Sequence, residues 1–220
     1  MNHLIVQSSE AVTLVGGGPV SAPGLAQALA FAPRIVAADG GADRVLRLGR
    51  QPEAVIGDMD SISAGAKAVL AGRLFPIPEQ ASTDFDKALR SIAAPFVLGL
   101  GFSGARLDHG LAVLNALVRH PDRRCLIVSA RDVTFLSPLE LTLTLPPGSR
   151  LSLFPMGPVT AESTGLCWPL HGLEFAPDAI IGTSNQVAAP KLQLRFSAPK
   201  MLVILPRAAL AAVLRGLGLR

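Results

Sequence analysis

The sequence predicts an α/β domain with a mostly parallel open sheet, followed by a smaller all-β sandwich domain. From residue 12 to about 130, short apolar runs alternate with helical patterns, which is typical of a parallel sheet flanked by helices. After about residue 132, strand-like pieces follow one another between Pro and Gly turns, which is typical of an antiparallel sandwich. We therefore expect a Rossmann-like domain over residues 1–132 and a β-sandwich domain with a short C-terminal helix over residues 133–220.

Apolar runs and helix signals define the elements of the first domain. Pro23 suits the first turn of a helix, Thr83 and Asp86 form a capping box at the start of another, and His120-Pro121 ends a third. The strands expected here are Val12–Val15, Ile35–Ala38, Ala54–Ile56, Phe96–Leu100 and Leu126–Val128, and the helices are Gly24–Phe31, Thr83 to about Ile92, and Leu107–Val118. In open parallel sheets, ligands bind outside the carboxyl ends of the strands, so we expect a functional site there.

In the second domain, turns such as Pro146-Pro147-Gly148 and Met156-Gly157-Pro158 separate the expected strands. Pro206 suits a first helical turn, and Arg207–Leu217 has the spacing of a short amphipathic helix. The strands expected here are Thr134–Leu136, Glu140–Leu145, Arg150–Phe154, Ala179–Ile181, Leu192–Phe196 and Met201–Leu205.

The composition is that of a folded protein without a strong electrostatic signature. The chain has 220 residues, of which 50% are hydrophobic and 16% charged, so it can bury one large core or two small ones. Its net charge of +4 comes from scattered arginines without an aromatic-interleaved basic stripe, so we expect no specific nucleic-acid partner. Cys125 and Cys167 have no metal-ligand spacing and are interpreted as free thiols in a reducing compartment. Without a recognisable signal peptide or an apolar run of roughly 18 residues, we expect a cytoplasmic protein that does not bind membranes.

Four short acidic clusters stand out in a chain with few charges. They are Asp39-Gly-Gly-Ala-Asp43, Gly57-Asp58-Met-Asp60-Ser61, Ser82-Thr83-Asp84-Phe-Asp86-Lys87 and Arg106-Leu-Asp108-His109. Two carboxylates about 4 Å apart repel by roughly 4 kcal/mol at an effective dielectric constant near 20, so carboxylates gathered at strand ends favour a bound cation. Mg²⁺ prefers oxygen ligands and joins carboxylates to substrate phosphates, which fits Asp58 and Asp60 with a third aspartate from elsewhere in the chain. A solvated turn is the alternative interpretation of this pair, since Asp and Ser are ordinary turn residues.

Two glycine turns follow expected strands of the first domain. Gly16-Gly17-Gly18, with Asp39 at the end of the next strand, and Gly99 to Gly104 are incomplete versions of the dinucleotide-binding fingerprint. Each is either a plain tight turn or a cradle in which backbone N–H groups bind phosphate.

Basic side chains lie beside the last two acidic clusters. Lys87 is a cation in a first helical turn, where the helix dipole disfavours it, so we expect it to reach a phosphate, whereas capping accounts for Asp86. Arg106 opens the next helix, where backbone donors and a guanidinium can meet an anion. His109 is either part of that anion site or a surface or cap residue.

In this order, the four clusters resemble the motifs of thiamine pyrophosphokinases. The second half agrees, because Thr164 to Leu170 and Gly182-Thr183-Ser184-Asn185 are similar to C-terminal motifs of that family. The resemblance covers about residues 12 to 205. It implies Mg²⁺-dependent transfer of diphosphate from ATP to the thiamine hydroxyl, with release of AMP, by a homodimer whose active sites lie between subunits.

The resemblance also implies roles for individual residues. Asp58, Asp60 and Asp84 are expected to hold Mg²⁺, and with Lys87 and Asp108 they form the expected catalytic set. ATP is expected to meet Asp39, Gly40, Gly101, Gly104, Arg106 and His109, and thiamine is expected to meet Trp168, Thr183, Ser184 and Asn185. The stretch Lys200-Met201-Leu202-Val203 lacks the aromatic residue on which some family members stack the thiamine ring.

Two other functions stay open at this point. The same diphosphate transfer could use a pterin-type alcohol as acceptor, since a fold does not fix its substrate. A nucleotide-binding or oxidoreductase module could instead use the glycine turns. That function leaves the aspartates without a purpose, because hydride transfer needs no magnesium site.

Overall fold

The computed structural model describes residues 4–104 and 106–219 and divides the chain into two compact units. The first unit extends through Ser129, and the second begins at Ala130. Each unit has its own buried apolar residues. No helix in the described part of the chain is long and apolar enough to cross a membrane.

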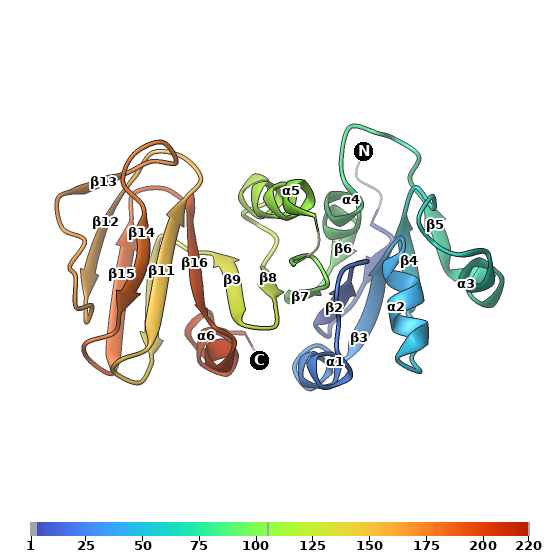
Figure 1. The fold of residues 1–220 in the computed structure, drawn as a ribbon, viewed down its shortest axis with the longest axis horizontal. Coiled ribbons are helices and arrows are strands. Elements are labelled where there is room, and N and C mark those ends of the chain that lie inside the picture. Colours follow the sequence, from blue (N-terminus) through green and yellow to red (C-terminus); the bar gives the residue numbers. More distant parts are fainter. Residues whose placement is uncertain (1–3, 105, 220) are drawn as a thin grey trace. The chain divides into compact units, whose positions relative to one another are not determined.

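The first unit contains a parallel sheet with the strand order β8-β7-β2-β3-β4-β5 (Figure 1). Its strands are β2 (Val12–Val15), β3 (Arg34–Ala38), β4 (Ala54–Gly57), β5 (Leu74–Pro76), β7 (Val97–Leu100) and β8 (Cys125–Val128), and every neighbouring pair is parallel. A separate parallel pair joins β1 (Val6–Gln7) to β6 (Ile92–Ala93). Strands β3, β4 and β5 follow β2 in one direction across the sheet, and β8 follows β7 in the other. Between these two strands the sheet therefore has the topological switch point at which open α/β sheets bind ligands.

Helices cover both faces of this parallel sheet, and most of its strands are apolar and buried. Helices α4 and α5 lie on one face, and α1 and α2 lie on the other (Figure 1). The helices are α1 (Ala22–Leu29), α2 (Gly41–Arg47), α3 (Ala64–Val69), α4 (Asp84–Arg90) and α5 (Leu107–Arg119), with a 3₁₀ turn at Ala71–Arg73. All residues of β2, β4, β7 and β8 are buried, as expected for a parallel sheet that is covered on both sides.

Side-chain caps fix where α1 and α4 begin. The Ser21 hydroxyl accepts a hydrogen bond from the Gly24 N–H, so α1 starts before Pro23 and not at Gly24 as expected. The Thr83 hydroxyl accepts from the Asp86 N–H at 3.4 Å, which confirms the expected cap of α4.

In the second unit, every neighbouring pair of strands is antiparallel. Four strands pair in the order β14-β11-β16-β9, and a separate four-stranded sheet has the order β10-β15-β12-β13. The strands are β9 (Asp132–Leu136), β10 (Glu140–Thr144), β11 (Arg150–Pro155), β12 (Val159–Thr164), β13 (Leu173–Phe175), β14 (Gly182–Gln186), β15 (Lys191–Phe196) and β16 (Met201–Pro206). Burial alternates along β10, β12 and β15, so that sheet has one covered and one exposed face. Helix α6 (Leu210–Gly216) follows a 3₁₀ turn at Arg207–Ala209 and packs against β10.

One expected strand is wrong and several elements were not expected. Ala179–Ile181 is not a strand, because the strand begins at Gly182 and leaves Ile180 and Ile181 exposed in the preceding turn. The helices and strands that the sequence patterns did not predict are α2, α3, β1, β5, β6, β12, β13 and β14. Both cysteines are free thiols, with Cys125 buried and Cys167 exposed.

Candidate active site

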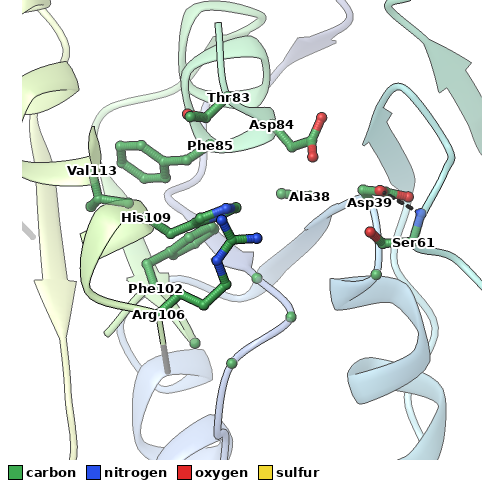
Figure 2. A pocket seen from close by; sticks show the side chains of 15 residues that line it. Ala38, Asp39, Ser61, Thr83, Asp84, Phe85, Phe102, Arg106, His109 and Val113 are labelled. Carbon is green, nitrogen blue, oxygen red and sulfur yellow. Dashed lines mark hydrogen bonds between the residues drawn. The ribbon is translucent and has the colours of Figure 1, made fainter. Parts of the chain in front are cut away.

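A cavity of about 240 Å³ lies at the carboxyl ends of the strands in the first unit. Figure 2 shows Phe102, Arg106 and His109 on one side of it and Asp39 with Ser61 on the opposite side. Its lining residues are Gly16, Gly17, Gly18, Ala38, Asp39, Gly40, Ser61, Thr83, Asp84, Phe85, Gly101, Phe102, Arg106, His109 and Val113. The loops that follow β2 and β7 both contribute, so the cavity lies at the switch point of the sheet.

The two glycine turns pack against each other at the base of this cavity. The Gly16 N–H donates to the Leu100 carbonyl at 2.8 Å, and the Gly18 N–H donates to the Gly101 carbonyl at 2.9 Å. A Cβ atom on Gly18 would lie 2.6 Å from that Gly101 oxygen, and Gly101 has a φ of +74°. Glycine is therefore required at these positions because the two backbone segments approach too closely to leave room for a Cβ atom. The N–H groups of Gly16 and Gly18 are donors within the protein, which favours the tight-turn interpretation for them.

Three carboxylates converge beside the cavity. One oxygen from each of Asp39, Asp58 and Asp60 lies within 4.8 Å of the others. Asp39 follows β3, and the other two follow β4, so neighbouring strand ends bring them together. A Cβ atom on Gly57 would lie 2.8 Å from the Asp39 Cβ and 3.0 Å from an Asp84 oxygen. A glycine at this position therefore lets the acidic side chains approach one another.

Asp39 is the buried member of this carboxylate cluster. Its side chain accepts hydrogen bonds from the N–H groups of Ser61 at 3.0 Å and Ile62 at 3.1 Å. Burial raises the pKa of Asp39 to about 6, and the negative charges of Asp84 and Asp60 act in the same direction. Burial and neighbouring negative charges make the ionised form of Asp39 unfavourable. A cation bound here would therefore stabilise the ionised carboxylates.

Lys87 and Asp84 also contact Asp58. The Lys87 ammonium contacts Asp58 Oδ2 at 2.9 Å and Asp84 Oδ1 at 3.2 Å, and its side chain is 1% exposed. Burial lowers the pKa of Lys87, but the two carboxylates outweigh it, and the pKa is raised. The hydrogen bond from Lys87 is the main reason that the pKa of Asp58 is lowered. Lys87 therefore orients the aspartates, and its expected phosphate contact stays a prediction.

Arg106, Asp108 and His109 open α5. The Arg106 guanidinium forms a two-point ion pair with Asp108, with Nε 3.1 Å from Oδ1, and both side chains are largely exposed. This hydrogen bond lowers the pKa of Asp108. Arg106 and His109 line the cavity, whereas Asp108 does not. Gly104, the remaining ATP-binding candidate of this loop, is also outside the lining and has a φ of +82°.

Asp86 does more than cap α4, so the interpretation from sequence is wrong on this point. Its carboxylate is buried, 2.8 Å from a guanidinium nitrogen of Arg119 and 2.9 Å from the His120 ring. Arg90 also lies 3.9 Å from this carboxylate. A buried carboxylate is costly unless it is paired, and these basic partners offset that cost, which capping of α4 alone does not. Asp86 therefore ties α4 to the C-terminal end of α5.

The four expected thiamine contacts lie together in the second unit. A cavity of about 330 Å³ is lined by Trp168, Pro169, Leu170, Leu173, Phe175, Ile180, Ile181, Gly182, Thr183, Ser184 and Asn185. The Asn185 side chain donates to the Trp168 carbonyl at 2.7 Å and accepts from the Trp168 N–H at 3.3 Å. Trp168 is 59% exposed, so its ring is available for stacking. None of residues 200–203 lines this cavity.

Several cavity residues were not anticipated from sequence. Phe102 and Phe85 form an edge-to-face pair with ring centroids 4.7 Å apart, and Val113 lies beside them in the cavity wall. Phe102 lies inside the Gly99 to Gly104 turn, which was the available signal for it. Ile180 and Ile181 were assigned to a strand and therefore missed as lining residues.

Comparison with known proteins gives a family match for each of the two units. The family model "Thiamin pyrophosphokinase, catalytic domain" matches residues 25–128, and "Thiamin pyrophosphokinase, vitamin B1 binding domain" matches residues 140–201. Thiamine pyrophosphokinase 1 of Arabidopsis thaliana is 29% identical over 196 residues, which are 70% of this chain and 71% of that protein.

Solved structures of other proteins are also similar. A protein from Lactobacillus plantarum matches with a TM-score of 0.74 and 27% identity, covering 90% of this chain and 99% of that one. Thiamin pyrophosphokinase from Candida albicans matches with a TM-score of 0.77 and 15% identity, covering 94% of this chain and 93% of that one, which shows a common fold.

Proposed function

This chain belongs to the thiamin pyrophosphokinase family, and we therefore infer that it transfers diphosphate from ATP to the hydroxyl of thiamine. The products are thiamine diphosphate and AMP. One observation supports assigning the phosphate chemistry to the first unit. The carboxylates of Asp39, Asp58 and Asp60 converge within 4.8 Å beside a cavity at the strand ends.

We propose Mg²⁺ as the cation of this site, held by Asp58 and Asp60 together with Asp39 or Asp84. The donor set fits, because all four side chains offer the hard oxygen ligands that Mg²⁺ prefers. Among the described residues, Lys87 is the one cation in ion-pair contact with these carboxylates, through Asp58 and Asp84. When bound, Mg²⁺ would neutralise negative charge on the ATP phosphates.

We propose that the protein contributes mainly by positioning two substrates for an in-line displacement at the β-phosphorus of ATP. Arg106 binds phosphate oxygens from the α5 side of the cavity, with Asp108 orienting its guanidinium. Lys87 keeps Asp58 and Asp84 oriented. The thiamine ring binds in the cavity that includes Trp168 and Asn185. As in the family resemblance, the active enzyme is a homodimer with its active sites between subunits.

The direct test of this function is release of AMP from MgATP with thiamine present and absent. We expect AMP to appear in proportion to thiamine diphosphate, and only slowly without thiamine. Equal AMP release under both conditions would contradict the transfer. A pterin-type alcohol in place of thiamine serves as the acceptor control, and the match to a vitamin B1 binding domain favours thiamine.

A matched pair of variants tests the metal assignment. Asp60→Asn keeps the shape of the side chain and removes a ligand charge, so we expect turnover to fall by about two orders of magnitude or more, as when the charge stabilisation of a phosphoryl-transfer site is lost. Asp122→Asn removes a carboxylate that is 77% exposed, and we expect wild-type turnover. Steady-state rates at saturating Mg²⁺ measure both. Wild-type turnover of Asp60→Asn would rule out this residue as a ligand.

A further inference from the structure

The C-terminal end of the loop that carries Asp58 and Asp60 is held by hydrogen bonds to Asp39, which precedes α2, and to Asp43, which lies in α2. Asp39, just before α2, accepts from the N–H groups of Ser61 and Ile62. Asp43, in the first turn of α2, accepts from the Ser63 N–H at 3.0 Å and from the Ser63 hydroxyl. Three successive backbone N–H groups of the loop are therefore held by two carboxylates one helical turn apart.

Asp43 and Ser63 form the outermost contact of this set. The Ser63 hydroxyl donates to Asp43 and accepts from the Ala66 N–H at 3.1 Å, so Ser63 also caps α3. The hydrogen bonds from Ser63 outweigh burial, and the pKa of Asp43 is lowered. Asp43 lines neither cavity and is not one of the clustered carboxylates. Its side chain therefore acts on the loop and not on a ligand.

The loop needs such support because its own backbone is strained. Met59, between the two expected ligands, has a φ of +67°, which a side chain with a Cβ adopts only at an energetic cost. Within the loop, the Asp60 N–H reaches Asp58 Oδ1 only at 3.4 Å, while the Ser61 hydroxyl donates to Asp60 Oδ1 at 2.8 Å. A strained turn persists when surrounding contacts hold both of its ends.

We propose that Asp43 is a positioning residue for the metal site: by holding Ser63 against α2, it fixes the geometry of Asp58 and Asp60. This inference rests on the proposed function for the identity of the metal. The carboxylate is required because it accepts two hydrogen bonds at Ser63, whereas an asparagine has one acceptor oxygen there and a donor group beside the second. Substitution of residues that orient metal ligands typically weakens metal affinity by about 10- to 100-fold. For Asp43 we expect a loss of about 10-fold, at the lower end of this range.

The test measures Mn²⁺ affinity by electron paramagnetic resonance in the presence of a non-hydrolysable ATP analogue. Asp43→Asn and Ser63→Ala are each expected to weaken Mn²⁺ binding about tenfold, as for other partners outside a ligand set. The double variant is expected to weaken it little further, because both changes disrupt the contact between Asp43 and the Ser63 hydroxyl, although Ser63→Ala also removes the cap of α3. Ser21→Ala is the matched control, since it removes the cap of α1 without touching the loop. Wild-type Mn²⁺ affinity is expected for this control.

A second measurement separates local positioning from general loss of stability. Amide hydrogen exchange followed by mass spectrometry is expected to speed up in the peptide containing residues 58–63 of Asp43→Asn, and not in the β2 and β7 strands. High Mg²⁺ is expected to restore most of kcat, because the ligands themselves are present. Loss of kcat that no Mg²⁺ concentration restores would overturn the positioning role.

The outcomes distinguish this inference from the proposed function. If wild-type protein binds Mn²⁺ and Asp43→Asn binds it equally well, the positioning role is wrong and the proposed function stands. If wild-type protein binds no Mn²⁺ although it releases AMP with thiamine, the metal site is misassigned and the role of Asp43 fails with it.

Discussion

Three residues other than glycine have a positive φ in the described part of the chain, and all three lie at the candidate sites. Asp39 has a φ of 40° and Met59 of 67°, both in the acidic cluster, and Ser184 has a φ of 61° in the second cavity. Left-handed backbone at a residue with a Cβ costs about 1–3 kcal/mol, and surrounding structure must hold it. The Ser184 N–H, for example, donates to the Ser152 hydroxyl at 3.0 Å. At the scale of single residues, the sites are therefore where this protein accepts conformational strain.

Gly57 is expected to be required for the acidic cluster. In Gly57→Ala, the new Cβ would meet the Asp39 Cβ at 2.8 Å, so the aspartates must move apart and Mg²⁺-dependent activity should fall at least tenfold, as for a misplacement of about 1 Å in other enzymes. Gly65→Ala is the control, because its Cβ meets nothing nearer than 4.0 Å in a helix, where alanine is favoured. Kinetics and thermal unfolding of both variants provide the measurement. Equal activity of Gly57→Ala and Gly65→Ala would contradict the expectation that a Cβ atom at residue 57 displaces the aspartates.

Lys87 is expected to control stability as well as orientation. Lys87→Met leaves Asp58 and Asp84 without their cation, and because these carboxylates are 14% and 30% exposed, we expect a loss of about 1–3 kcal/mol, below the full cost of breaking a buried pair. Added Mg²⁺ should recover part of that loss, since it replaces the missing positive charge. Chemical denaturation with and without Mg²⁺ measures both effects. An unchanged midpoint in the absence of Mg²⁺ would show that the ion pairs contribute nothing net.

At the scale of elements, helix α4 links the acidic cluster to its surroundings. Its N-terminal turn supplies Asp84 and Lys87, Asp86 joins it to α5, and Arg90 joins it to the preceding loop through Glu79 at 2.8 Å. The cavity walls on α4 and α5 are therefore coupled by ion pairs away from the cavity. Substitutions in this network should act through helix placement.

The Glu79–Arg90 contact predicts a pH effect on stability. Hydrogen bonds from Ser82 and Arg90 lower the pKa of Glu79 from 4.5 to about 2, so the folded state favours the ionised form. This contribution is fully present above the unfolded pKa of 4.5 and is lost as the pH falls towards 2. Glu79→Gln should therefore be less stable than wild type at neutral pH, with a difference that shrinks as the pH falls from about 4.5 towards about 2. A difference that is constant with pH, measured by urea denaturation, would contradict this linkage.

Sequence patterns predicted the elements whose signals are local. The buried strands β2, β3, β4, β7 and β8 are mostly apolar, and the Thr83 side chain caps α4, so both kinds of signal could be recognised in the sequence. Helices α2 and α3 are short and were missed, because Gly41 at the start of α2 resembles a turn residue. That glycine is required instead by packing, since its Cβ would lie 2.0 Å from the Val15 carbonyl oxygen. Contacts between distant segments of this kind leave no periodic pattern.

The candidate site was predictable in its residue types but not in its partnerships. The order of the aspartate motifs identified Asp58 and Asp60, yet nothing in the sequence shows that Lys87 is buried between Asp58 and Asp84. Nor does it show that Asp86 has Arg119 and His120 as partners, since these residues lie more than 30 positions away. Spacing predicts which side chains share a strand end, whereas ion pairs across helices depend on the packing of the whole unit.

At the scale of the whole molecule, the proposed function assigns the two substrates to cavities of different chemistry. The cavity of the first unit combines carboxylates with Arg106, as phosphates and a cation require, and that of the second is mostly apolar around Trp168. Trp168 is the only tryptophan in the sequence and lines the cavity of the second unit, so its fluorescence is a probe of that cavity. Under the proposed function, it would follow thiamine binding directly.

We expect thiamine to change Trp168 fluorescence in the absence of nucleotide. The ring is 59% exposed at the edge of the cavity, and an aromatic cation stacked on it would remove it from water. Asn185→Ala removes the side chain that holds the Trp168 backbone at 2.7 Å, so it should weaken thiamine binding and leave binding of the ATP analogue unchanged. NADH should produce no saturable response, because its phosphates have no cationic partner among the residues that line this cavity. If fluorescence stays constant at thiamine concentrations that saturate AMP release, the thiamine site is elsewhere.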